Sequence, residues 1–152
     1  MEPMTATLTS TGSTAAVIVT HQRAELLRAS LAQVVHQTHP VQWVVVVDNG
    51  AEDAVRELVE SMAGDRGVYV PSETNLGGAG GFALGFLTAL SLGADAVWCA
   101  DDDGRPADHA VLAELYRVAE ANRLHEVSPA VCNIDDPGRL AFPLRQGLVW
   151  RR

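Results

Sequence analysis

Unbroken apolar runs alternate along this chain with segments of helical spacing, and this alternation constrains the fold more than any other feature. Residues 15–19 and 43–47 contain only apolar side chains. Such runs are typical of parallel strands that are covered on both faces. Between them, apolar residues recur every three or four positions, as they do along one face of an α-helix. The sequence therefore predicts an α/β fold.

Shorter apolar runs predict further strands at residues 68–70, 96–100 and 127–131. Helical spacing separates these strands too, and Asp108 is placed to cap one of the helices. Strands that alternate with helices form a parallel, Rossmann-like sheet with helices on both faces. Because ligands of such sheets bind beyond the carboxyl ends of the strands, we expect the residues after each strand to line one shared crevice.

Three adjacent aspartates, Asp101, Asp102 and Asp103, follow the predicted fourth strand. Neighbouring carboxylates repel one another and raise their own pKa values unless a cation is present. Alternate side chains of an extended segment share a face, so Asp101 and Asp103 are predicted to bind one Mg²⁺ or Mn²⁺ ion, which prefers oxygen ligands. Such an ion would neutralise a diphosphate leaving group. The alternative is a solvated acidic turn that caps the next helix.

A glycine-rich segment at residues 75–81 precedes the helix after the third strand. Glycines let a backbone approach a ligand closely, and the first turn of a helix attracts anions such as phosphate. Two alternatives remain open. In the first, the glycines serve only close helix packing. Residues 78–83 also fit the dinucleotide-binding pattern GxGxxA, although they follow the third strand rather than the first.

Single polar residues end the first two predicted strands. Asp48 is placed to accept a hydrogen bond from a base edge such as the uracil imide, and equally to form the turn at residues 48–50. Thr20 ends the first strand, and Arg23 follows it, either near a phosphate or simply exposed to solvent. The sequence leaves these alternatives open.

The composition is that of one globular domain, with 152 residues, 47% hydrophobic residues and a formal net charge of −8. This charge disfavours binding to nucleic acid. Cys99 and Cys132 lack metal or disulfide spacing and are expected to be small buried residues in a reducing compartment. With neither a signal peptide nor a membrane span expected, the sequence predicts a cytoplasmic protein. It does not indicate the oligomeric state.

Four motifs together resemble the inverting nucleotide-sugar glycosyltransferases of the GT-A fold, and in particular their galactofuranosyl- and rhamnosyltransferase branch. They are VIVTHQR at 17–23, VVVDNG at 45–50, NLGGAGGF at 75–82 and DDDG at 101–104. Their order and spacing match this family across roughly residues 15–135. The resemblance implies that the chain is the nucleotide-binding half of a GT-A fold, apparently truncated. It divides the chain into a disordered leader (1–13), a nucleotide-sugar-binding subdomain (14–135) and the start of an acceptor-side region or an irregular tail (136–152).

The same resemblance implies a metal-dependent, inverting transfer of galactofuranose from UDP-galactofuranose to a polyprenyl-diphosphate-linked glycan in cell-wall galactan synthesis. It further implies peripheral membrane association through this acceptor, at the inner face of the plasma membrane, and a general base outside the chain. Asp101 and Asp103 are the implied metal ligands, with Mn²⁺ or Mg²⁺ as the ion. The implied nucleotide-sugar-binding residues are Thr20, Arg23, Asp48, Asn75, Gly78, Gly80, Gly81, Asp101 and Asp102.

Two other functions remain as alternatives. One is a non-catalytic, receiver-like α/β module that binds Mg²⁺, but such modules carry their acidic pair after the first strand, where this chain has Thr20 and His21. The other is a fragment of a dinucleotide-binding oxidoreductase. Binding of UDP or of NAD, with and without metal, distinguishes these functions.

Overall fold

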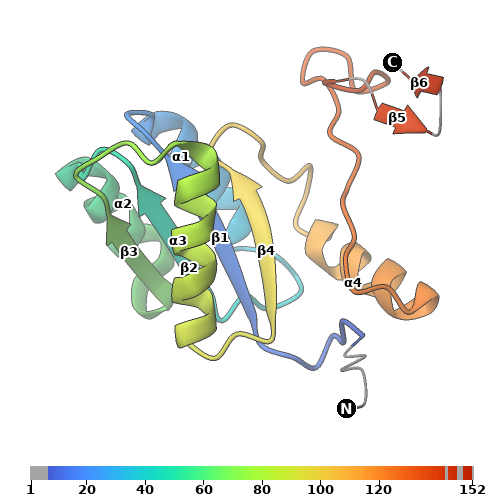
Figure 1. The fold of residues 1–152 in the computed structure, drawn as a ribbon, viewed down its shortest axis with the longest axis horizontal. Coiled ribbons are helices and arrows are strands. Elements are labelled where there is room, and N and C mark those ends of the chain that lie inside the picture. Colours follow the sequence, from blue (N-terminus) through green and yellow to red (C-terminus); the bar gives the residue numbers. More distant parts are fainter. Residues whose placement is uncertain (1–6, 143, 147–148, 152) are drawn as a thin grey trace.

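Four parallel strands form one sheet in the order β3-β2-β1-β4 (Figure 1). The structure, a computed structural model, describes residues 7–142, 144–146 and 149–151. The strands are β1 (Thr14–Thr20), β2 (Trp43–Asp48), β3 (Gly67–Pro71) and β4 (Ala96–Asp101). The predicted α/β fold is thus confirmed, and so are the first four predicted strands.

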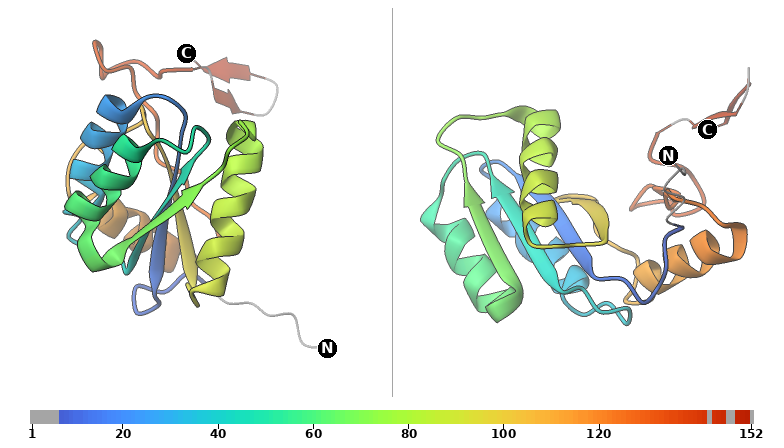
Figure 2. Two further views of the ribbon diagram at one scale, coloured as in Figure 1. Left: turned by 90° about the vertical axis from the view of Figure 1, so that its left-hand side faces the viewer. Right: turned by 60° about the horizontal axis from the view of Figure 1, so that its bottom comes forward.

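Helices cover both faces of the sheet, as predicted (Figures 1 and 2). Helices α1, α2 and α4 pack on one face, and α3 packs on the other. Their bounds are α1 (Ala24–Val34), α2 (Asp53–Ala63), α3 (Gly77–Ser91) and α4 (Val111–Asn122), with a short 3₁₀ turn, η1 (Gly64–Arg66), before β3.

The central strand β1 explains why an unbroken apolar run is needed. Ala16 and Ile18 face the core under α1 and α2, whereas Ala15 and Val17 face the core under α3. All four side chains are fully buried. A strand with a solvated face would alternate apolar and polar residues, so this run is a direct consequence of the two covered faces.

Helix α3 lies unusually close to β1 because two of its glycines leave room for valine side chains. A Cβ atom at Gly81 would lie 2.5 Å from Val19 Cγ1, and one at Gly85 would overlap Val17. Gly78, in the first turn, is different, since nothing lies within 4 Å of its Cβ position. Packing therefore explains Gly81 and Gly85 but not Gly78.

The predicted fifth strand at residues 127–131 is wrong. No strand is assigned to this segment, in which Pro129 lacks a backbone donor and Val131 is 39% exposed. The chain instead ends, within the described residues, in a small antiparallel hairpin of β5 (Leu144–Gln146) and β6 (Val149–Arg151). This hairpin lies in the part predicted to be an acceptor-side region or an irregular tail.

Two smaller expectations also change. Asp108 does not cap α4, because the helix begins at Val111 and the Asp108 carboxylate instead accepts a hydrogen bond from the Ala110 amide. Cys99 and Cys132 are exposed rather than buried. Residues 1–6 of the predicted leader lie outside the described residues, whereas Ser13 donates two hydrogen bonds to Asp95 and so joins the starts of β1 and β4.

None of the helices in the described part of the chain combines the length and the apolar character needed to span a bilayer.

Replacing Gly85 by alanine should lower the free energy of unfolding by about 1–3 kcal/mol, because the new methyl group would force Val17 or the helix to move. Gly78→Ala is the matched control in the same helix; it should leave stability unchanged or raise it by up to about 1 kcal/mol through helix propensity. Urea denaturation of both variants measures the difference. Equal effects of the two substitutions would contradict the close packing of α3 on β1.

Candidate functional site

The carboxyl ends of the four strands lie level with one another. Thr20 pairs with Asp48 in the β1–β2 register, Asp48 pairs with Pro71, and Val19 pairs with Asp101. The chain winds outward from β1 through β2 to β3 and then crosses to β4 on the other side of β1. Parallel sheets bind ligands at such a switch point, which here lies between Thr20 and Asp101.

Asp102 is the buried member of the acidic run, with only 1% of its side chain exposed. Its Oδ2 accepts a hydrogen bond of 2.8 Å from the Thr20 hydroxyl. Its Oδ1 lies 2.9 Å from Arg23 Nη2 in an ion pair. The three residues therefore join the end of β4 to the end of β1 and to the loop that precedes α1.

Asp101 and Asp103 are exposed, so the residues on either side of Asp102 point away from the core. Partial burial nevertheless raises the pKa of the Asp101 carboxyl, and the negative charges of Asp103 and Asp102 raise it further, while Arg23 opposes them. Arg23 Nη1 also donates a hydrogen bond of 2.9 Å to Asp103 Oδ2. Ser30, on α1, donates a hydrogen bond to the Asp101 carbonyl and holds the end of β4 in place.

Two exposed carboxylates are a suitable but incomplete ligand set for a hard divalent cation. Mg²⁺ and Mn²⁺ are often bound by one or two carboxylates, with water and substrate phosphate completing the shell. Within the described residues, no three His, Cys, Asp or Glu side chains converge on one point. Asp101 and Asp103 would therefore hold such an ion only if water or phosphate oxygens supplied the remaining ligands.

Asp48 is fully buried, and its carboxylate forms the turn after β2. Its oxygens accept hydrogen bonds from the Gly50 amide at 2.9 Å and the Glu52 amide at 2.7 Å. The Tyr69 hydroxyl donates a third, of 3.0 Å, from β3. The structure thus shows the turn-forming role that the sequence left open, whereas contact with a base stays a prediction.

Asn49 connects this turn to the start of α3. Its side-chain oxygen accepts a hydrogen bond from the Leu76 amide, and its side-chain nitrogen donates one to the Gly77 carbonyl, both at 3.3 Å. Asn75 is exposed, and its side chain accepts a hydrogen bond of 2.9 Å from the Gly77 amide. The first turn of α3 is therefore fixed at the same sheet edge as Thr20 and Asp48.

The glycines of this turn differ in what the fold requires of them. Gly77 has a φ of +66°, a backbone conformation that favours glycine. A Cβ atom on Gly80 would lie 2.8 Å from Leu76 Cβ, and Gly81 packs on Val19. Only Gly78, which is exposed, has no internal contact that explains a glycine. A role in ligand binding stays a prediction for Gly78, Gly80 and Gly81.

Sequence reasoning missed three residues that build the site: Ser30, Asn49 and Tyr69. Each acts through a hydrogen bond to a segment distant in the sequence. Asn49 carried a weak signal, because it stands in the turn after a predicted strand. Ser30 and Tyr69 lie inside regular elements, where nothing in the local pattern distinguishes them from other packed residues.

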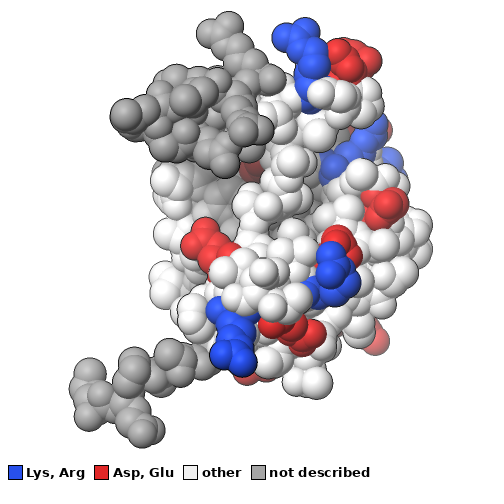
Figure 3. All heavy atoms as spheres, turned by 90° about the vertical axis from the view of Figure 1, so that its right-hand side faces the viewer, with Lys and Arg blue, Asp and Glu red and all other residues white. Residues whose placement is uncertain are grey.

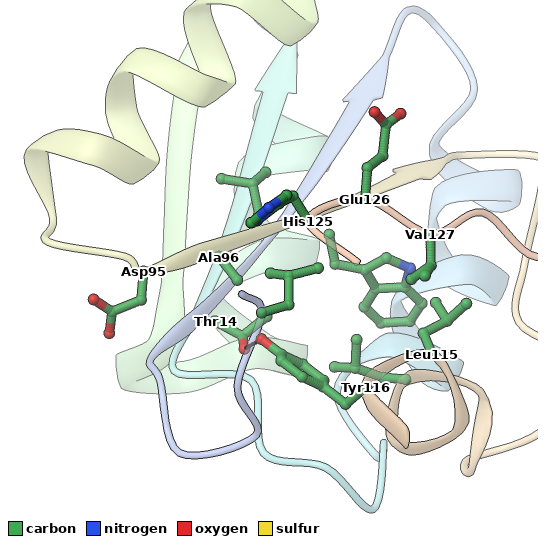
Figure 4. Close-up of a pocket in the computed structure, with 12 residues that line it drawn as sticks. Thr14, Asp95, Ala96, Leu115, Tyr116, His125, Glu126 and Val127 are labelled. Carbon is green, nitrogen blue, oxygen red and sulfur yellow. Dashed lines mark hydrogen bonds between the residues drawn. The ribbon is translucent and has the colours of Figure 1, made fainter. Parts of the chain in front are cut away.

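An apolar cavity of about 260 Å³ lies at the opposite end of the sheet, between β4 and α4 (Figure 4). Thr14 and Ala96, which begin β1 and β4, line it together with Tyr116 of α4. The Thr14 and Tyr116 hydroxyls are hydrogen bonded at 2.6 Å. This cavity is therefore separate from the acidic strand ends.

Figure 3 shows the side of the molecule that carries α4. On this face, basic side chains of the described residues stand singly and next to acidic ones. No basic patch forms there among the described residues.

The fold is that of a parallel α/β protein whose polar and acidic side chains gather beyond the carboxyl ends of its strands. Residues 15–150 match glycosyl transferase family 2, and the chain belongs to this family. That membership leaves the receiver-like and dinucleotide-binding alternatives without support.

Curated relatives carry the comparison further. The chain is 57% identical over 145 residues to the galactofuranosyltransferase GlfT1 of Mycolicibacterium smegmatis; the match covers 95% of this chain and 48% of the relative. It is 58% identical over 144 residues to GlfT1 of Mycobacterium tuberculosis, covering 93% of this chain and 47% of the relative. The chain thus spans about half the length of the relatives it matches.

Solved structures support the fold. A mannosyltransferase from Pyrobaculum calidifontis, in complex with GDP-Man and Mn²⁺, superposes with a TM-score of 0.54 and 22% identity, over 82% of this chain and 35% of that chain. S. aureus TarS superposes with a TM-score of 0.56 and 22% identity, over 72% of this chain and 20% of that chain. The predicted GT-A fold is therefore confirmed.

The Tyr69 phenol should ionise well above its usual range. Burial, and then the hydrogen bond to Asp48, raise its pKa to about 12 from 10.0. Its neutral form is favoured by folding, so the stability it contributes is present below pH 10 and is lost as the pH rises towards about 12. The difference in tyrosinate absorbance between the wild type and Tyr69→Phe isolates this group. A pKa near 10.0 for Tyr69 in the folded protein would contradict its burial and its contact with Asp48.

Proposed function

We propose that the chain provides the donor-binding part of a galactofuranosyltransferase. The proposed reaction moves galactofuranose from UDP-galactofuranose to a polyprenyl-diphosphate-linked glycan in cell-wall galactan synthesis, with inversion at the sugar. The observation that supports it most is the 57% identity to GlfT1, which extends over 95% of this chain and includes the acidic strand end.

The donor would lie across the carboxyl ends of β1, β2 and β4. Uridine would be held near Asp48 and Thr20, with the ribose and diphosphate extending towards the acidic run. Helix α3 spans 15 residues. A helix of this length has a dipole that, with the free amides of its first turn, would attract the diphosphate. The start of α3 contains three of the proposed donor-binding residues, Gly78, Gly80 and Gly81, and Asn75 precedes it. Two more, Arg23 and Asp102, lie beside the switch point.

Asp101 and Asp103 would hold the divalent cation, Mn²⁺ or Mg²⁺. Their exposure to solvent supports this assignment. So do the negative charges of Asp103 and Asp102, which add to the effect of burial in raising the pKa of the Asp101 carboxyl and which a cation would offset. When bound, such an ion neutralises the charge that develops on a diphosphate leaving group. The related mannosyltransferase was solved with Mn²⁺ and a nucleotide sugar.

The acceptor side of the proposal rests on similarity to GlfT1 alone. A lipid-linked acceptor would bring the protein to the inner face of the plasma membrane as a peripheral component. An inverting displacement also needs a general base that deprotonates the acceptor hydroxyl. We assign this base to none of the described residues.

Calorimetry with UDP should detect binding in the presence of Mn²⁺ and much weaker binding when Mn²⁺ is removed. Asp101→Asn and Asp103→Asn should each weaken metal-dependent UDP binding roughly tenfold or more, since each removes a charged metal ligand. Asp65→Asn is the matched control, because Asp65 is exposed in η1, before the amino end of β3. Binding of GDP as tight as UDP, or UDP binding independent of metal, would contradict the proposal.

Gly78→Ala should weaken UDP binding roughly tenfold, about 1.4 kcal/mol, without lowering the stability of the protein. The added methyl group meets no protein atom within 4 Å, so any loss of affinity arises from the space it takes from the ligand. Calorimetry and urea denaturation on the same sample separate the two effects. Unchanged UDP affinity would remove Gly78 from the proposed site.

A further inference from the structure

Arg23 makes two ion pairs with the acidic run, and the two differ in environment. Its Nη2 lies 2.9 Å from Asp102 Oδ1 in an ion pair without hydrogen-bond geometry, and its Nη1 donates a hydrogen bond of 2.9 Å to Asp103 Oδ2. The Asp102 side chain is 1% exposed, whereas the Asp103 side chain is 54% exposed and that of Arg23 is 47% exposed. One guanidinium therefore joins a buried carboxylate to one in solvent.

The two contacts should differ in strength for the same reason. Breaking the contact to Asp102 leaves a buried carboxylate with less charge compensation, which is destabilising. An exposed pair contributes little and is readily exchanged. The Thr20 hydroxyl also holds Asp102, which gives the buried contact a second anchor that Asp103 lacks. The contact to Asp103 is therefore the one that a competing cation displaces.

We propose that Arg23 is a positioning residue that keeps Asp103 paired until metal and diphosphate arrive together. The Nη1 group holds Asp103 in the metal-free protein, a divalent cation takes its place, and the released Nη1 group turns to the diphosphate. The Nη2 group stays on Asp102 throughout. This inference rests on the proposed function for the identity of the diphosphate, but the competition at Asp103 is a property of this chain alone.

Two consequences distinguish this role from a merely structural one. A metal ion alone must displace Arg23 and tolerate a nearby positive charge, so it binds weakly. Uridine diphosphate offers the displaced Arg23 guanidinium a new ion-pair partner. It therefore increases the affinity for the metal by more than its own coordination of the metal would. Arg23 therefore contributes to the coupling between the two ligands, and this coupling is measurable from either ligand.

The test measures Mn²⁺ binding by calorimetry, with Mn²⁺ alone and then with saturating uridine diphosphate. Arg23→Gln should bind Mn²⁺ alone about fivefold more tightly than the wild type, as expected for the loss of an exposed competing ion pair. The factor by which uridine diphosphate strengthens Mn²⁺ binding should be smaller in Arg23→Gln than in the wild type.

Arg28→Gln is the matched control. Arg28 lies on α1 and pairs with Glu25, so its substitution makes the same change in net charge away from the acidic run. It should leave both measurements unchanged. Arg23→Lys keeps one charge but not the planar fork, so it should bind Mn²⁺ alone with an affinity between those of the wild type and Arg23→Gln.

Arg23→Gln also leaves Asp102 with less charge compensation and should melt at a lower temperature than the wild type. Mn²⁺ should raise its melting temperature more than that of the wild type, a readout that holds even for a weakened fold.

Mn²⁺ binding to Arg23→Gln that is no tighter than to the wild type would overturn the proposed competition, whatever uridine diphosphate does. An equal tightening in Arg28→Gln would overturn it too, because the effect would then be one of net charge. If the wild type binds no uridine diphosphate in Mn²⁺, the proposed donor is wrong, and the comparison with Mn²⁺ alone still decides the role of Arg23 at Asp103.

Discussion

The buried carboxylate of Asp102 is the contact on which the candidate site depends. It accepts a hydrogen bond from the Thr20 hydroxyl at the end of β1 and pairs with the Arg23 guanidinium in the loop before α1. Asp102 therefore joins the segment after β4 to the segment after β1. Loss of both partners would leave this buried carboxylate without compensation for its charge. Because Asp102 is held inward, its neighbours on either side are directed towards solvent. The exposure of Asp101 and Asp103 is therefore a consequence of the burial of Asp102.

Helix α3 serves the fold and the candidate site through different glycines. Gly81 and Gly85 bring the helix onto the valines of β1, which places its first turn at the strand ends. Asn49 then fixes that turn to the end of β2. Gly78 stands at the free surface of the same turn and meets no protein atom. Close packing of one face of the helix on β1 thus fixes the position of the open amide turn at its start.

The elements that the sequence predicts well are those with a repeating local pattern. The apolar run of residues 43–47 has no other reasonable fold than a strand covered on both faces, and the structure confirms it. The run at 127–131 fails because Pro129 and the exposure of Val131 outweigh its composition. The sequence also predicted a cation near the acidic run, but it did not predict that Arg23 pairs with Asp102 and Asp103 there. Thr20 and Asp102 meet across 82 positions, and no local pattern encodes such a contact.

The charges at the strand ends favour the same function as the family does. Arg23 pairs with two of the three aspartates, Asp102 and Asp103, so the acidic run and Arg23 together carry two uncompensated negative charges when all three carboxyls are ionised. Burial is the main cause of the raised pKa of the Asp101 carboxyl, and the negative charges of Asp103 and Asp102 raise it further. A divalent cation would restore neutrality, and it would also free Arg23 from Asp103. In the proposed complex, the charge of the diphosphate would then meet both the released guanidinium and the amides of α3. A metal ion alone gives that guanidinium no new partner, which is why metal and donor are expected to bind together.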